Sequence, residues 1–139
     1  MTKREELEKL IRQGDAGPDE LFVFFDSLEP VKTEEMSGSY RGQEVPSGNP
    51  LDGLLEEYGW YGKRFTGEDD VDPLLFCDSR GRVFQLDPGR LPLSLLSKIL
   101  IRQKPLIRFV RIFIRFFKTD KAKARLRMIW YRGKNSAAM

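Results

Sequence analysis

The chain has 139 residues, of which 40% are hydrophobic, and a formal net charge of +3. This length and apolar content allow one compact domain with a hydrophobic core and leave too few residues for a second full domain. The absence of histidine excludes Ser-His and Cys-His nucleophile pairs and removes the commonest metal ligand. We therefore predict no catalytic residue, no metal site and no cofactor, and an enzymatic function is not favoured.

Two absences bear on the compartment. No stretch reaches the roughly 18 uncharged apolar residues that are needed to span a bilayer. The first ten residues, MTKREELEKL, lack the apolar segment of a signal peptide. These features predict a cytoplasmic protein. The single cysteine, Cys77, cannot form an internal disulfide, and we expect an inert thiol there.

The first third of the chain predicts two helices. A helix over residues 5–13 places three aliphatic side chains on one face and ends at Gly14. A second helix begins near Pro18, a residue that suits the first helical turn. The apolar run LFVFF that follows predicts that this second helix is buried and about ten residues long.

The middle of the chain predicts an antiparallel sheet. We expect a strand over residues 35–40, a short helix over 51–58 and an apolar strand from Asp72 to Cys77. The turn SRGR joins this last strand to the alternating segment RVFQL, so the two should form a hairpin. With the N-terminal helices, these elements predict an α+β fold that contains a curved antiparallel sheet.

Two glycine-bracketed aromatic segments flank the predicted short helix: GSYRG at residues 38–42 and GWYGKRF at residues 59–65. Glycines beside an aromatic ring mark places where the backbone bends or approaches another segment closely. With FFDSLEPV before them, NPLDGLL between them and VDPLLF after them, these segments resemble the GXWXG family over residues 24–76. The tryptophan of the family motif corresponds to Tyr40, whose hydroxyl would need a hydrogen-bond partner if buried.

The resemblance implies a partial, calycin-like β-barrel, the architecture of lipocalins and fatty-acid-binding proteins. A barrel of this size holds one small apolar or amphipathic ligand. Aromatic side chains would form the wall of the cavity, and cations would meet an anionic head group. In the alternative interpretation, the rings fill the core and the cations are exposed. The predicted ligand-binding residues are Tyr40, Arg41, Trp60, Tyr61, Lys63, Arg64, Phe65 and Trp130.

The same resemblance implies a division of the chain. The segment KARLRMIWYRGKNSAAM at residues 123–139 is similar to the opening of the uncharacterised domain that usually follows, which would make it a truncated domain. We therefore predict a GXWXG domain with N-terminal helices over residues 1–90, and a basic helix and first strand over 91–139, in one structural unit. The free edge of a strand at 123–132 predicts a homodimer formed by strand pairing.

Charge is distributed unevenly along the chain. Residues 1–97 carry a net charge of −9, and residues 98–139 carry +12. In the basic part, cations recur at intervals of three and four residues, which on a helix gives a basic stripe beside a wide apolar face. We predict a basic amphipathic helix over residues 106–118. The cations of this stripe are Arg108, Arg111, Arg115 and Lys118.

Three interpretations of the basic helix stay open. Its apolar face packs on the sheet, or it lies on an anionic membrane surface with its arginines on lipid phosphates, or it binds a partner protein or a second subunit. Nucleic acid is not favoured, because no helix-turn-helix, RNP or zinc-finger spacing accompanies the cations. The leading hypothesis is non-enzymatic binding of a small apolar or amphipathic ligand. The alternative is a peripheral membrane or protein-interaction module that uses residues 106–118.

Overall fold

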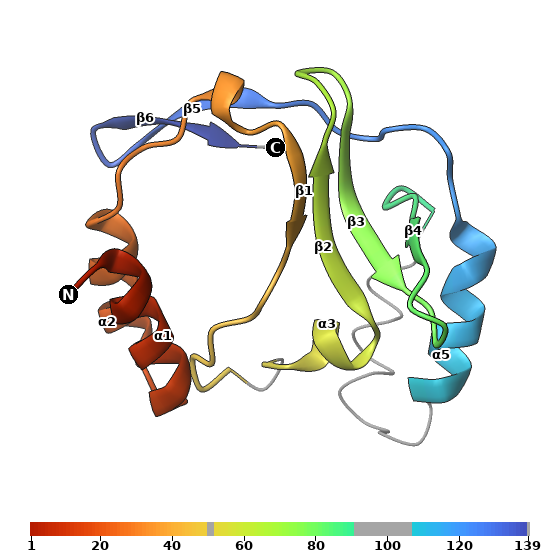
Figure 1. Ribbon diagram of the computed structural model, residues 1–139, viewed down its shortest axis with the longest axis horizontal. Coiled ribbons are helices and arrows are strands. Elements are labelled where there is room, and N and C mark those ends of the chain that lie inside the picture. Colours follow the sequence, from red (N-terminus) through yellow and green to blue (C-terminus); the bar gives the residue numbers. More distant parts are fainter. Residues whose placement is uncertain (50–51, 91–106, 139) are drawn as a thin grey trace.

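The computed structural model describes residues 1–49, 52–90 and 107–138, with side chains in the last range from Phe109 onward. It confirms the predicted α+β fold (Figure 1). In chain order the elements are α1 (Lys3–Gln13), α2 (Pro18–Asp26), η1 (Thr33–Glu35), β1 (Gly38–Arg41), α3 (Leu54–Glu57), β2 (Trp60–Phe65), β3 (Val71–Cys77), β4 (Val83–Gln85), α5 (Ile107–Phe113), η3 (Ile114–Phe117), β5 (Arg127–Tyr131) and β6 (Lys134–Ala138).

The strands form two antiparallel groups. The first is a four-stranded sheet in the order β1-β2-β3-β4, and the second is the β5–β6 hairpin. In Figure 1 the α1–α2 pair lies on the left, the hairpin at the top and the four-stranded sheet to the right. The predicted antiparallel sheet is therefore confirmed, whereas the described strands do not close into a barrel.

The predicted basic strand at 123–132 is shorter than expected and is paired within the chain. Its first residues instead bond to the start of β3: the N–H groups of Lys123 and Ala124 both donate to the carbonyl of Val71 at 3.1 Å. The strand β5 then begins at Arg127 and pairs with β6, which the sequence did not predict. One edge of this strand is thus closed inside the same molecule, while pairing between two copies stays a prediction.

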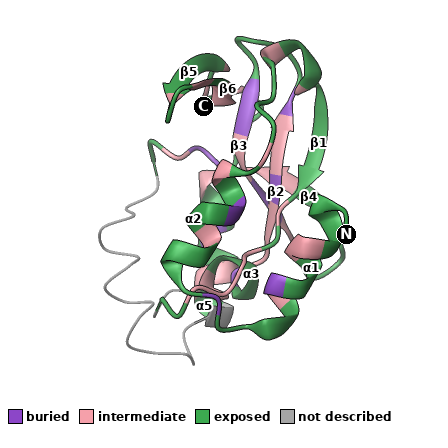
Figure 2. Cartoon of the chain, turned by 90° about the vertical axis from the view of Figure 1, so that its left-hand side faces the viewer, coloured by how far each residue is buried: buried purple, intermediate pink, exposed green. Residues whose placement is uncertain are grey.

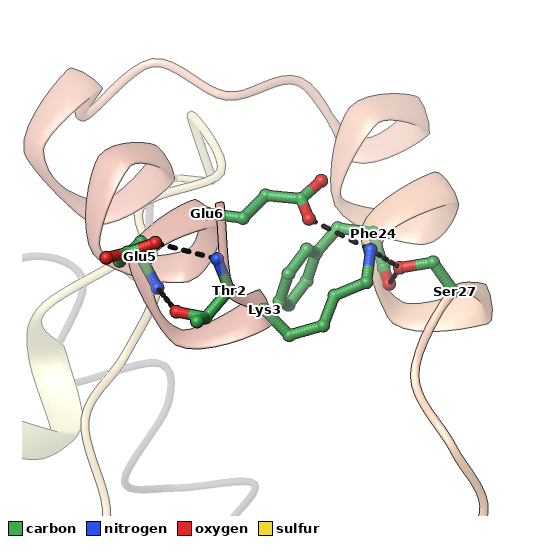
Figure 3. Close-up of polar contacts among 6 residues, drawn as sticks. All are labelled: Thr2, Lys3, Glu5, Glu6, Phe24 and Ser27. Carbon is green, nitrogen blue, oxygen red and sulfur yellow. Dashed lines mark hydrogen bonds and ion pairs between the residues drawn. The ribbon is translucent and has the colours of Figure 1, made fainter.

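The α1–α2 pair is joined at its ends by polar contacts (Figure 3). A capping box starts α1: Thr2 Oγ1 accepts the N–H of Glu5 at 3.2 Å, and Glu5 Oε2 accepts the N–H of Thr2 at 2.7 Å. Gly14 ends this helix in the left-handed conformation, with φ 72°. Lys3 Nζ donates to Ser27 Oγ at 2.7 Å, so the start of α1 is tied to the end of α2.

The helix α2 begins at Pro18 as predicted, but the prediction that it is buried was wrong. Within the LFVFF run only Phe24 is buried, in a small cluster with Leu10 of α1. Phe22 and Phe25 are 49% and 56% exposed. Because this cluster lies between α1 and one face of α2, the other rings of the run are covered only in part: Phe25 meets the ring of Tyr131 edge to face at 5.6 Å, and the Arg132 guanidinium lies 5.3 Å from the ring centroid of Phe22.

A second cluster of buried residues lies between the sheet and the α5–η3 segment. Val110 and Phe117 pack against it from that segment, and buried positions are concentrated along β2 and β3 (Figure 2). The predicted helix at 106–118 is therefore α5 followed by the 3₁₀ turn η3, with residue 106 outside the described residues. The predicted boundary at 90/91 adjoins undescribed residues and stays a prediction. The buried members of the cluster are Tyr58, Phe76, Leu86 and Ile114.

Asp78 closes the turn between β3 and β4. Its Oδ1 accepts the N–H of Arg82 at 3.0 Å and that of Arg80 at 2.9 Å, and its Oδ2 pairs with the Arg82 guanidinium at 2.9 Å. These contacts, led by the backbone N–H of Arg82, lower the pKa of Asp78 to about 2.

A carboxylate with a lowered pKa adds stability that is complete above its ordinary pKa of about 4 and is lost as the pH falls towards the folded value of about 2. We expect Asp78→Asn to reduce the free energy of unfolding at pH 7 and to flatten its decline between pH 4 and 2, as measured by urea denaturation. Asp15→Asn, in the exposed turn after α1, is the control. Unchanged pH dependence in Asp78→Asn would contradict the prediction.

Candidate functional site

A pocket of about 350 Å³ lies between the β1–β2 edge of the sheet and the end of β6. It combines aromatic and aliphatic walls with two cationic side chains, and it brings together segments that are far apart in the sequence. The lining residues are Met36, Tyr40, Arg41, Gly42, Trp60, Gly62, Lys63, Phe65, Leu126, Ala137 and Ala138.

An irregularity in β2 decides which of its side chains face the pocket. Strict alternation would place Tyr61 on the same face as Lys63 and Phe65. Relative to β3, however, β2 has an extra residue between Trp60 and Gly62, where the register shifts. Trp60 therefore lines the pocket together with Lys63 and Phe65, and Tyr61 does not.

The glycines of the two aromatic segments allow β1 and β2 to approach closely. A Cβ atom on Gly62 would overlap the carbonyl oxygen of Tyr40, and Gly62 has φ +148°, which favours glycine. A Cβ atom on Gly42 would overlap the ring of Trp60. Neither position has room for a side chain: Gly62 lies against the backbone of Tyr40, and Gly42 lies against the indole ring of Trp60.

Tyr40 lies at the mouth of the pocket and is 43% exposed. Its ring meets that of Phe65 edge to face, with centroids 5.5 Å apart. Its hydroxyl donates to the carbonyl oxygens of Ser37 at 3.4 Å and Glu35 at 3.5 Å. Tyr40 stands where the family motif has tryptophan, and its hydroxyl has hydrogen-bond partners in the segment before β1.

Arg41 and Lys63 bring positive charge to this apolar pocket. Within the described parts of the chain, neither cation forms an ion pair or a side-chain hydrogen bond. Burial lowers the pKa of Lys63, because an ammonium group loses hydration in an apolar setting. The indole Nε1 of Trp60 is also buried, and no described group accepts its hydrogen. The site thus has donors and positive charge, and the described residues offer no acceptor for them.

Three of the predicted ligand-binding residues lie away from the pocket. Arg64 donates to Asp72 Oδ2 at 2.9 Å, and Gln85 Nε2 donates to the same oxygen at 2.6 Å, so Arg64 serves to neutralise a buried carboxylate. Trp130 is 71% exposed on β5. Tyr61 is half-buried and does not line the pocket.

The sequence missed four pocket residues that carry no chemical motif: Met36, Leu126, Ala137 and Ala138. Met36 lies just before β1, whereas only a tertiary contact could have revealed Leu126 and the two alanines, because they come from the far end of the chain. The N–H of Leu126 donates to the carbonyl of Glu68 at 2.7 Å, and that of Ala137 donates to Val31 at 2.8 Å. These two bonds bring the C-terminal segment to the pocket.

The predicted basic stripe is divided between different surroundings. Arg111 is half-buried and lies against Gly59, whereas Arg115 is exposed. Lys118 Nζ stands 4.4 Å from the ring centroid of Phe84, a cation–π contact with β4. The side chain of Arg108 lies outside the described residues.

A family model described as GXWXG protein matches residues 23–81, from α2 to the turn after β3. The chain contains a GXWXG domain. The resemblance drawn from the two glycine-bracketed segments is thereby confirmed, and the glycines and rings of the GXWXG domain form the β1–β2 side of the pocket. No curated protein matches the chain.

The fold is shared with a crystal structure of a protein from Thermomonospora curvata. The two are 28% identical in sequence and superpose with a TM-score of 0.63, over 99% of this chain and 72% of that chain. In the part of the chain that the structure describes, no helix is long and apolar enough to cross a membrane. Nor do those residues contain a cluster of three or more candidate metal ligands.

The glycine contacts give a direct test of the pocket architecture. We expect Gly62→Ala to reduce the free energy of unfolding by about 3 kcal/mol or more, because its methyl group would overlap a backbone atom and its φ is strained. Gly42→Ala should cost about 1–3 kcal/mol, since the Trp60 ring can shift. The ring shift should also change the near-ultraviolet circular dichroism.

Gly67→Ala is the matched control, because it lies in the exposed β2–β3 loop with only an ordinary contact for an added Cβ. Its effect should stay within about 1 kcal/mol. Equal stability of Gly62→Ala and Gly67→Ala would refute the close approach of β1 and β2.

Proposed function

We propose that the GXWXG domain binds a small anionic amphiphile in the pocket between β1, β2 and β6. The observation that carries this proposal is the pair of cations, Arg41 and Lys63, which line an apolar pocket without a partner among the described residues. A carboxylate or similar head group would supply the missing counter-charge, and the rings of Trp60 and Phe65 would contact its apolar part. A calycin-like arrangement, in which a curved sheet cups one ligand, is part of the proposal.

The composition of the pocket favours binding over catalysis. None of its described lining residues is an acid, a serine, a threonine or a cysteine. Acid–base work commonly uses a pair of titratable groups with separated pKa values, and only one lining residue, Lys63, has a shifted pKa. We therefore propose a carrier or sensor of an amphiphile and not an enzyme.

Binding should depend on the charge of the ligand. We expect decanoate to bind and decanol, which has the same tail without the charge, to bind more weakly by about tenfold or more. Lys63→Met and Arg41→Met should each reduce decanoate affinity and leave decanol affinity unchanged, as measured by isothermal titration calorimetry. Lys9→Met on the exposed face of α1 is the control.

The pH dependence has a definite sign. Burial lowers the pKa of Lys63 in the free protein, and a bound anion would raise it. Decanoate affinity should therefore fall as the pH rises through the free-state pKa of Lys63, below its usual value of about 10.4. Native mass spectrometry of protein purified without added ligand adds an independent readout, a discrete mass lost on denaturation. Equal affinities for decanoate and decanol, or no binding of either, would exclude an anion site.

We also propose a second candidate function, contact with an anionic membrane surface through α5 and η3. Four apolar side chains at intervals of three, one and three residues point to solvent there: Phe109, Ile112, Phe113 and Phe116 are 69%, 62%, 49% and 78% exposed. Arg115 and Lys118 are exposed on the same segment. Aromatic rings beside cations suit the boundary between lipid head groups and acyl chains.

We expect vesicles containing anionic lipid to retain the protein on flotation, with binding that weakens at high salt. Phe109→Ser with Phe116→Ser should abolish retention, and Arg115→Ser with Lys118→Ser should weaken it most at low salt. Phe22→Ser, which removes a 49% exposed ring from α2, is the control. Membrane contact through α5 and η3 would be ruled out if both double variants bound the vesicles as well as the unchanged protein does, or if the protein bound uncharged vesicles equally well.

A further inference from the structure

A second hollow of about 1010 Å³ forms a groove between α2 and the β5–β6 hairpin. It contains much of the apolar surface that the fold leaves uncovered. Phe22 and Phe25 of α2 are 49% and 56% exposed, and Val31 and Ile129 are 38% and 43% exposed. Monomeric proteins rarely leave so continuous an apolar surface without a use for it.

Four charged residues line this groove, and three of them, Asp26, Arg132 and Lys134, take part in contacts between the end of α2 and the hairpin, whereas Glu29 is exposed. Arg132 forms an ion pair with Asp26 at the end of α2. Lys134 Nζ donates to the carbonyl oxygens of Asp26 at 2.7 Å and Leu28 at 3.0 Å, which satisfies the C-terminal end of that helix. Both lining cations are therefore used to attach the hairpin to α2. The groove suits an uncharged chain and not an anionic head group.

The groove and the pocket adjoin at the end of β6. Ala137 and Ala138 line both hollows. This strand runs along the top of the view in Figure 1, and its end points towards β1. Because alanine has the smallest side chain with a Cβ, the two residues that the hollows share add little side-chain volume between them.

We propose that the ligand is a long-chain anionic amphiphile, with its head group at Arg41 and Lys63 and its acyl tail in the groove between α2 and the hairpin. This inference rests on the proposed function and adds the ligand class. The positive charge is confined to one hollow and the larger uncovered apolar area to the other. That division matches the two ends of such a molecule.

The test is a series of straight-chain carboxylates from eight to sixteen carbons, titrated calorimetrically below their micelle concentrations. Each methylene that enters the groove should tighten binding by up to about fourfold. Ser136→Phe places a ring in the groove from β6 and should stop this increase for the longer acids while leaving the eight-carbon acid unaffected. Asn135→Phe, the neighbouring exposed residue that lines neither hollow, is the control.

A second variant guards against misfolding. Phe25→Ser removes an exposed ring from the groove wall and should weaken only the longer acids. Short acids that bind with no gain in affinity for longer ones would overturn the long-chain inference and leave the head-group site intact. Failure of every acid to bind would overturn both. A ligand-free dimer in native mass spectrometry that Ser136→Phe dissociates would show a second copy in the groove and overturn the inference.

Discussion

The close approach of β1 and β2 is the constraint on which the rest of the site depends. Gly62 leaves no room for a side chain against the carbonyl of Tyr40, and Gly42 leaves none against the ring of Trp60. Trp60 packs against the cluster that lies between the sheet and the α5–η3 segment, and it also lines the pocket. The register shift beside Gly62 then sets Trp60 on the face that carries Lys63. The two glycines therefore fix which rings and which charge share the pocket.

Local signals in the sequence predicted the elements, and long-range contacts decided the site. Capping residues and apolar periodicity were enough for α1, for the start of α2 and for the β3–β4 hairpin. Tyr40, Trp60 and Phe65, which the glycine-bracketed segments contain, line one pocket, while their role in binding stays a prediction. The sequence placed Arg64 at the site as a cation next to the aromatic residues. In the structure it pairs with the buried Asp72, eight positions away, and no sequence pattern reveals that contact. The exposure of Phe25 was equally hidden, since burial depends on what packs over a helix and not on the helix itself.

Folding brings some cations of the basic C-terminal part into ion pairs with carboxylates of the acidic first part. Ion pairs join the basic last part of the chain to the acidic first part at three places, from the end of α2 to the residues after β4: Arg132 with Asp26, Arg125 with Asp69 and Lys123 with Asp87. Hydrogen bonding from Lys123 lowers the pKa of Asp87, so this carboxylate stays ionised in its pair. Part of the C-terminal charge thus serves attachment, whereas Arg115 and the pocket cations, among the described residues, form no ion pair and are available to an outside anion.

The two separate clusters of buried residues have a consequence for how the molecule opens. The cluster between α1 and α2 contains only Leu10, Ala16 and Phe24, whereas the other lies under the four-stranded sheet. Polar contacts from Arg132 and Lys134 attach the helical pair to the hairpin. A unit with so small a core opens at a lower free energy than the whole protein, and its amide hydrogens exchange accordingly sooner. We therefore expect the α1–α2 pair to open first, while the four-stranded sheet stays folded.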